Sequence, residues 1–215
     1  MKKDNSEINK SSWEQLLNPK ILKNNLSFIA LYIMTFELLK ERIEKSVDEF
    51  FYIEYKQNEK GEIKKEENED YKNKVLSLLN DYERQNKFYV KASIKWLIYF
   101  NIFDENDENL YNELRIYRNE LTHEFQNYLI DKKKILDTKK MESLVSLFIK
   151  LEKNWILNFE VLVNEDFDGK DIKWEEVNSG QITILNIIHG IVFSDETTEW
   201  DYYNFFFKKN NEEFT

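Results

Sequence analysis

Cysteine, proline and glycine are scarce in this chain, and each scarcity excludes a class of protein. There is no cysteine, which excludes disulfide frameworks, thiolate zinc sites and cysteine nucleophiles. Only 4 glycines and 1 proline occur among 215 residues, whereas β-sandwiches and β-barrels need many tight turns built on these residues. The composition therefore favours an all-α protein whose helices are joined by short polar loops.

Long apolar runs are missing as well. The longest, residues 28–36, is too short to span a bilayer, and Glu37 follows it directly. The first ten residues, MKKDNSEINK, contain no apolar segment of the kind found in a signal peptide. We therefore expect no membrane association and a cytoplasmic protein.

The net charge of −10 restricts the ways in which this chain can bind nucleic acid. Coating nucleic acid non-specifically requires clustered lysine and arginine, which the acidic balance argues against. The charge leaves room for an enzyme that handles RNA at one small basic site. Only 4 of the 31 basic residues are arginine, so the position of each arginine carries information.

Apolar residues at helical spacing are abundant. A stripe with steps of three and four residues predicts a helix from about Ile21 to Tyr55, and Asn18-Pro19 marks its start because proline is tolerated in a first helical turn. Residues 56–70 are polar and charged, which predicts an exposed loop or the frayed tip of a helical hairpin.

The same spacing predicts further helices along the chain. An apolar segment at 89–103 predicts a buried helix, and the acidic break at 104–109 can cap the next helix, expected from about Asn109 to Ile130. An amphipathic helix is expected from Met141 to Leu162. The predicted architecture is a four- to five-helix antiparallel bundle over residues 21–163.

Two segments flank this predicted bundle. Residues 1–20 form an N-terminal lead-in, and residues 164–215 form a C-terminal extension that is expected to pack on the bundle. Within the extension, QITILNIIHGIVF (181–193) is compatible with a strand or a buried helix. The stretch 195–209, rich in aromatic residues, predicts a short helix docked on the bundle.

The stretch IYRNELTHEF, residues 116–125, bears most directly on function. Arg118 and Asn119 precede His123, one of only 2 histidines, by five and four residues. On a helical wheel the apolar stripe of this helix comprises Leu110, Leu114, Tyr117, Leu121, Phe125 and Tyr128. Asn119 and His123 lie on nearly the opposite side, and Arg118 lies at the edge of the stripe. His123 is therefore expected on the surface rather than in the core.

RNELTH resembles the R-x4-6-H signature of HEPN-superfamily domains, in the form R-N-x-x-x-H. In that family the motif lies on a late helix of a four- or five-helix bundle, and the resemblance covers roughly residues 20–163. It implies a metal-independent hydrolase, an endoribonuclease without a cofactor that often serves as a toxin or as an effector of antiviral defence. It also implies RNA as the substrate, a homodimer in which two motifs face one cleft, and an antitoxin or defence-system partner.

The resemblance assigns roles that suit the residue types. Arg118 would hold the scissile phosphate, because a guanidinium binds phosphate through two hydrogen bonds and stabilises growing charge. His123 would transfer a proton, since imidazole titrates near neutral pH. Asn119 would orient the histidine or the phosphate. Two facing copies of these residues would also form a local basic patch on an acidic protein.

One group of HEPN toxins, which nucleotidyltransferase antitoxins regulate, has a tyrosine two residues after the histidine as the site of adenylylation. This chain has Phe125 at that position, on the predicted core stripe. That mode of control is therefore not expected here.

Several other residues are candidates. Glu37 interrupts an apolar face and either pairs with Arg118 in the active cleft or lies in solvent. Arg115, Lys132 and Lys133 are candidates for contact with the RNA backbone, although the two lysines would also favour the C-terminus of the preceding helix.

Two further features are more simply explained by structure. His189, among apolar residues, is expected to be a hydrogen-bonded core or turn histidine. The acidic clusters lack the glycine of a calcium loop, so no metal site is expected. The rival to an enzyme is a non-catalytic helical module, either an antitoxin or immunity protein or a HEPN-like domain that binds a nucleotide or a partner.

Overall fold

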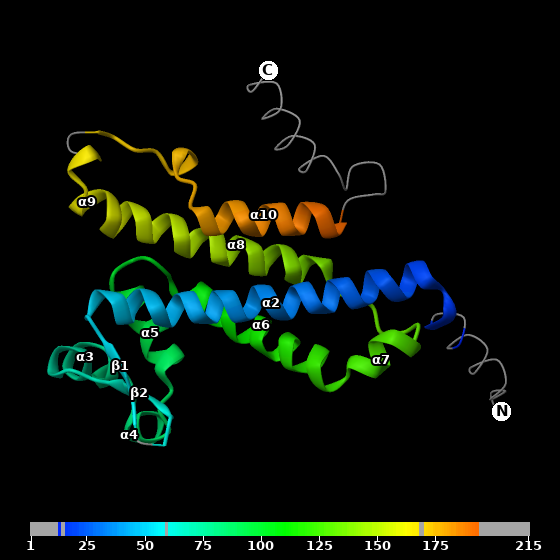
Figure 1. Cartoon of the computed structure of the whole chain (residues 1–215), viewed down its shortest axis with the longest axis horizontal. Coiled ribbons are helices and arrows are strands. Elements are labelled where there is room, and N and C mark those ends of the chain that lie inside the picture. The colour runs from blue at the N-terminus through cyan, green and yellow to red at the C-terminus, as the bar shows by residue number, and fades with distance from the viewer. Residues whose placement is uncertain (1–12, 14–15, 59, 168–169, 194–215) are drawn as a thin grey trace.

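The computed structural model describes residues 13, 16–58, 60–167 and 170–193, which are mostly helical with one small sheet (Figure 1). The long helices are α2 (Pro19–Phe50), α5 (Tyr89–Tyr99), α6 (Glu105–His123), α8 (Thr138–Trp155) and α10 (Gly180–Phe193). The shorter elements are β1 (Glu54–Gln57), β2 (Ile63–Glu66), α3 (Glu69–Lys74), η1 (Leu76–Leu78), α4 (Asp81–Gln85), α7 (Phe125–Ile130), η2 (Ile156–Glu160), α9 (Val161–Val163), η3 (Glu165–Phe167) and η4 (Trp174–Glu176).

Helix α2 is the centre of the molecule. The other four long helices all contact or flank it, and α6 and α10 run opposite to α2 and α8 (Figure 1). Its fully buried side chains include Tyr32, Leu39, Ile43 and Val47. Because neighbours cover α2 on several sides, its buried surface is wider than the single stripe that the apolar spacing predicts.

The start of α2 is the predicted one. The side-chain oxygen of Asn18 accepts hydrogen bonds from the backbone N–H groups of Lys20 at 3.1 Å and Ile21 at 3.2 Å. Pro19 occupies the first helical position, where its missing N–H leaves no bond unmade. The helix ends at Phe50 rather than near Tyr55, the end expected from the apolar spacing.

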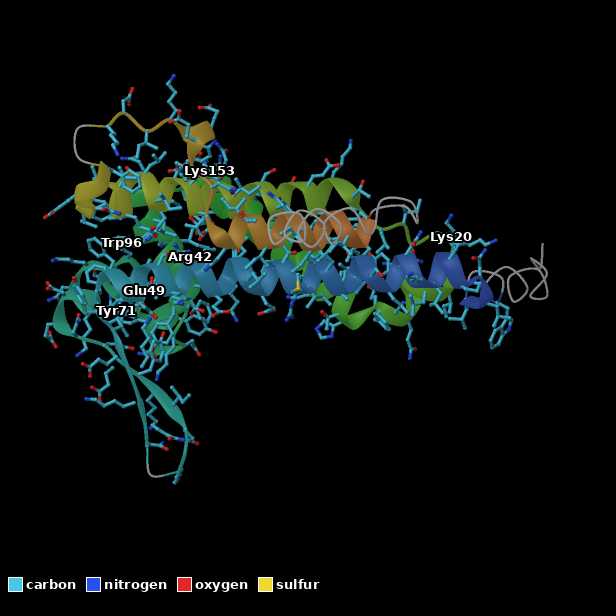
Figure 2. The ribbon with its side chains drawn as sticks, turned by 45° about the horizontal axis from the view of Figure 1, so that its top comes forward. Lys20, Arg42, Glu49, Tyr71, Trp96 and Lys153 are labelled. Carbon is cyan, nitrogen blue, oxygen red and sulfur yellow. The ribbon has the colours of Figure 1, made fainter. Side chains whose placement is uncertain are left out.

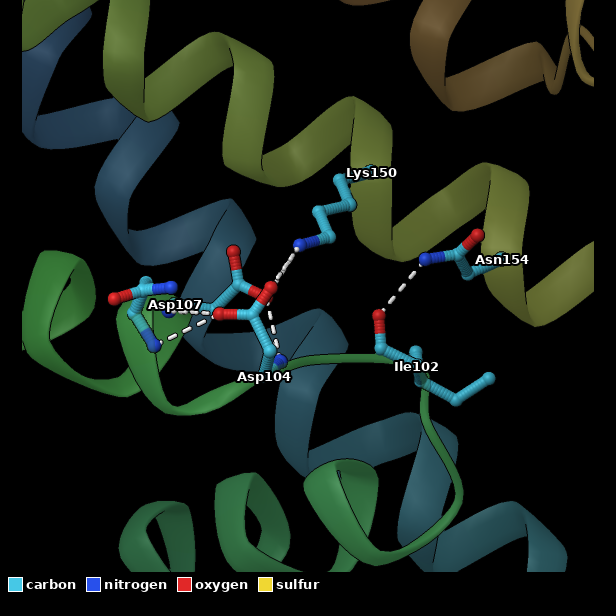
Figure 3. A network of polar contacts seen from close by, with 6 residues as sticks. Ile102, Asp104, Asp107, Lys150 and Asn154 are labelled. Atoms are coloured by element: carbon cyan, nitrogen blue, oxygen red, sulfur yellow. Dashed lines mark hydrogen bonds and ion pairs between the residues drawn. The ribbon is translucent and has the colours of Figure 1, made fainter.

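The acidic break before α6 caps that helix, as predicted. Asp104 is the N-cap and forms a capping box with Asp107. Lys150 of α8 donates to both carboxylates, at 2.9 Å and 2.6 Å, and Asn154 donates to the carbonyl of Ile102 at 2.8 Å (Figure 3). The Lys150 ammonium holds the pKa of Asp104 below its usual value. These contacts fix the N-terminus of the motif helix against α8.

The prediction of a loop or a helical tip at 56–70 is wrong. Strands β1 and β2 pair antiparallel as a hairpin that projects from the bundle beside the end of α2 (Figure 2). Seven of the eight strand residues are exposed, so the sequence shows no alternation of apolar and polar residues there. The hairpin is anchored by Lys65, which donates to the buried carboxylate of Asp48 and, at 2.7 Å, to the hydroxyl of Tyr71.

The helix expected over 109–130 is interrupted. It begins earlier, at Glu105, and stops at His123, because Glu124 has non-helical backbone angles and α7 starts after it. The interruption moves Phe125 off the expected stripe, and its side chain is exposed. Tyr111 is buried instead, and its ring stacks on Phe36 with centroids 5.4 Å apart.

The C-terminal segment 181–193 is helical, which decides between the two structures that its sequence allowed. Helix α10 contacts α2 through the ring pair Phe28–Phe193, with centroids 6.2 Å apart. The predicted aromatic helix at 195–209 lies outside the described residues, as does most of the lead-in at 1–20. No helix within the described ranges is long and apolar enough to cross a membrane.

Candidate functional site

Arg118 lies on α6 with its side chain facing α2. Its Nη2 atom forms an ion pair with Glu37. Of the two alternatives that the sequence left open for Glu37, pairing with Arg118 or lying in solvent, the structure therefore has the pairing. Its Nη1 atom donates to the side-chain oxygen of Asn119 at 3.3 Å. The Arg118 side chain is 29% exposed, so the guanidinium is held from two sides and still reaches solvent.

The Nε atom of Arg118 is buried and has no hydrogen-bond partner among the described residues. A buried donor without a partner is unfavourable, typically by about 1–3 kcal/mol. The guanidinium is therefore incompletely satisfied by the chain itself. The exposed part of the guanidinium can still donate to a group that accepts several hydrogen bonds, such as a phosphate.

His123 is the last residue of α6 and is exposed, as its position on the helical wheel predicted. Its side chain forms no hydrogen bond or ion pair with the described part of the chain. Asn119 lies one turn before it on the same face of the helix. No hydrogen bond or ion pair joins His123 to Arg118, and only Arg118 lines the groove beside it.

A groove of about 660 Å³ runs beside Arg118, between α2, α6, α5 and the turn that joins α4 to α5. Its basic lining residues are Lys40, Lys87, Lys91, Arg115 and Arg118. Its acidic lining residues are Glu37, Glu44 and Glu108. Its aromatic lining residues are Phe36, Phe88, Tyr89 and Tyr111. Asn119 also lines this groove, whereas His123 does not.

The remaining candidates divide between the groove and a loop elsewhere. Arg115 is exposed and lines the groove. Lys132 and Lys133 are exposed in the loop after α7 and do not line it. Their neighbour Lys134 forms ion pairs with Glu120 at 2.8 Å and Glu124 at 2.7 Å, and these carboxylates raise the pKa of Lys134. This loop is thereby tied to the C-terminus of the motif helix.

His189 has the environment of a structural histidine. Its Nε2 atom lies 3.2 Å from the hydroxyl oxygen of Thr35, a fully buried residue of α2. Burial lowers the pKa of His189. The structure therefore agrees with the expected core or turn role.

The structure adds Lys87 and Phe88 to the groove, which sequence reasoning missed. They belong to the turn between two helices and carry no motif. Only their tertiary position, on the groove that Arg115 of α6 also lines, makes them notable. Within the described ranges no group of three or more histidine and acidic side chains is placed to hold a metal ion.

Comparison with protein-family models, with curated proteins and with solved structures finds no match for this chain.

Proposed function

We propose that this protein is a metal-independent endoribonuclease that acts as a homodimer, in the manner of the HEPN-type toxins and antiphage effectors that its R-N-x-x-x-H motif resembles. In this proposal α2, α5, α6 and α8 form the HEPN-like bundle. The observation that carries the proposal is the state of Arg118. Glu37 and Asn119 orient its guanidinium at the edge of a groove, and the group remains partly exposed with donor capacity to spare.

The cleavage step requires only groups that the chain contains. The 2′-oxygen of a ribose attacks the adjacent phosphorus, and an imidazole of His123 accepts the proton of the 2′-hydroxyl. The bond from phosphorus to the 5′-oxygen breaks, and an imidazolium donates a proton to that oxygen. The products are a 2′,3′-cyclic phosphate and a 5′-hydroxyl. Arg118 stabilises the negative charge that grows on the phosphate oxygens.

The geometry of α6 explains why a dimer is required. A spacing of five residues places Arg118 and His123 about 140° apart around the helix. One copy therefore does not direct both side chains at one phosphate. Two copies with facing α6 helices would supply two imidazoles, one to accept a proton and one to donate it, together with two guanidinium groups.

The test is cleavage of total RNA by the purified protein in the presence of EDTA. We expect products with 2′,3′-cyclic phosphate ends, and a loss of at least about 100-fold in rate for Arg118→Ala and for His123→Ala. The matched control is His189→Gln, which alters the other histidine and should cleave at the wild-type rate. Absence of cleavage by the wild type, together with normal growth on expression, would exclude the enzyme.

The dimer can be tested separately. Because the chain has no cysteine, one introduced cysteine is the only site that a thiol-reactive spin label can modify. Thr122 is exposed and adjacent to His123, so Thr122→Cys carries one spin label beside the motif. Facing motifs predict a strong dipolar coupling between two labels. A chain that is monomeric at working concentration, or a dimer without that coupling, would contradict the proposed cleft.

The ion pair itself favours a second candidate function. Glu37 neutralises Arg118 within the chain, which is compatible with a non-catalytic module that binds a nucleotide or a protein partner, such as an antitoxin or immunity protein. In that case Arg118→Ala and His123→Ala would leave RNA intact exactly as the wild type does, while binding of the partner would still depend on the groove.

A further inference from the structure

The groove beside Arg118 is basic, although the chain is acidic. Five basic and three acidic side chains line it, a formal excess of two positive charges on a chain whose net charge is −10. Positive charge concentrated in one groove attracts an anionic ligand locally even when the whole molecule is negative.

Two of the five cations are not engaged by the fold. Lys91 forms an ion pair with Glu83, and Glu37 lies within ion-pair distance of both Arg118 and Lys40. The side chains of Lys87 and Arg115 form no ion pair or hydrogen bond with the described part of the chain. They stand on opposite elements, the α4–α5 turn and α6, so the groove has a free cation on each of these walls.

Phe88, next to Lys87, places an apolar ring at the same groove. Phe88 is 42% exposed, and its ring and that of Tyr82 form a T-shaped pair with centroids 6.1 Å apart. An exposed aromatic ring next to free cations is the arrangement by which proteins bind single-stranded nucleic acid, because bases stack on the ring while cations hold the phosphates. A groove of about 660 Å³ is in the size range of sites for ligands as large as a nucleotide.

We propose that this groove binds a single-stranded segment of the RNA substrate, with phosphates at Lys87 and Arg115 and a base stacked on Phe88, and delivers the strand to Arg118. The delivery rests on the proposed function, whereas the binding does not. Contacts to phosphates and base faces need no 2′-hydroxyl, so the groove should also bind single-stranded DNA, which the enzyme cannot cleave. Stacking and phosphate contacts are tolerant of sequence, so we expect little base preference in this groove.

The backbone conformation at Lys87 allows a substitution that removes the charge without straining the fold. Lys87 has a φ of 57° and closes α4, with the N–H of Phe88 bonded to the carbonyl of Glu83 at 3.1 Å. Glycine is the residue that helix ends of this kind favour, because it adopts a positive φ without strain. Lys87→Gly therefore removes the groove cation while preserving the local fold. Arg115→Gln and Phe88→Leu remove the second cation and the ring.

The experiment measures binding of a fluorescent single-stranded oligodeoxynucleotide by anisotropy over a range of salt concentrations. We expect Lys87→Gly, Arg115→Gln and Phe88→Leu each to weaken binding about tenfold. The two variants that remove a cation should also make the negative slope of log affinity against log salt shallower by about 0.7. Lys139→Gln, which removes an exposed cation of α8 outside the groove, is the matched control and should bind as the wild type does.

The outcomes separate the two proposals. Equal affinity for the wild type and all three groove variants, or equal affinity for single-stranded and duplex DNA, would overturn the groove assignment even if RNA is cleaved. Groove-dependent binding of the oligodeoxynucleotide without cleavage of RNA would overturn the ribonuclease and leave the binding site standing.

Discussion

Two arginine–glutamate ion pairs each include one residue of helix α2, and they differ in how deeply they are buried. Arg42 of α2 donates to Glu152 of α8, with 10% and 3% of the two side chains exposed. Glu37 of α2 accepts from Arg118 of α6, with 42% and 29% exposed. The first pair is completed by Trp155, whose ring lies 5.7 Å from the Arg42 guanidinium, and by two further carboxylates within 3.8 Å. One of these carboxylates belongs to Glu49, which is labelled with Arg42 in Figure 2.

The contrast shows that burial, rather than residue type, separates a structural ion pair from one that is available for chemistry. The Arg42 pair is almost entirely buried and has several partners, so its geometry is fixed once the core forms. The Arg118 pair has one carboxylate, an amide neighbour and a route to solvent. A ligand anion can therefore compete for Arg118 but not for Arg42.

The largest expected effect comes from breaking the buried pair. Arg42→Met leaves the Glu152 carboxylate buried without its cation and should lower the free energy of unfolding by about 3–5 kcal/mol. Urea denaturation followed by circular dichroism measures this change. In the double variant Arg42→Met/Glu152→Leu both charges are gone, and most of the lost stability should return. A double variant as unstable as the single one would show that the pair is not the cause.

The equivalent change in the exposed pair should hardly affect stability. Glu37→Gln is expected to change the free energy of unfolding by less than about 1 kcal/mol, because solvent screens both groups. Its effect should appear in catalysis instead, as slower RNA cleavage by a guanidinium that is no longer oriented. Stability loss comparable with that of Arg42→Met would mean that the two pairs are alike, and unchanged cleavage would show that Glu37 does not position Arg118.

The two histidines also differ in burial, since His189 is partly buried and His123 is exposed. Burial lowers the pKa of His189 below its ordinary value of 6.5. The unfolded chain therefore binds more protons at this residue than the folded chain once the pH falls below about 6.5. The stability associated with neutral His189 is fully present above that pH and is lost as the pH falls through the folded pKa.

Thermal unfolding between pH 5 and pH 8 tests this prediction for His189. The loss of stability on acidification should be smaller in His189→Gln than in the wild type. His123→Gln, which alters the other, exposed histidine, serves as the comparison. Parallel profiles for all three proteins would contradict the burial of His189 in the folded state.

The sequence predicted the features that depend on local chemistry. Asn18-Pro19 begins α2 and Asp104 caps α6 because these residues satisfy free N–H groups within their own helical turn. The hairpin was missed because its strands are almost entirely exposed and lack alternation. The break at Glu124 was missed because the apolar spacing continues across it, and Phe125 was wrongly placed in the core for the same reason.

In the candidate site too, some features follow from local spacing and others from tertiary packing. The helical period alone placed His123 on the surface and Arg118 at the edge of the buried stripe, since side-chain direction around a helix follows from spacing. The spacing also left open whether Glu37 would face Arg118 or solvent. Residues 81 positions apart along the chain meet only when α2 and α6 pack. The packing of α5 against both helices brings Lys87 and Phe88 to the same groove as Arg115.

The sequence by itself therefore determined a mostly helical chain, the start of α2, the acidic cap before α6, and which faces of the motif helix turn inward. These properties arise from periodicity and from groups within one turn of each other. Only the tertiary structure decided which carboxylate meets which arginine, which cations stay free and where a groove forms. Each of these depends on contacts between residues distant in sequence, for which no local pattern exists.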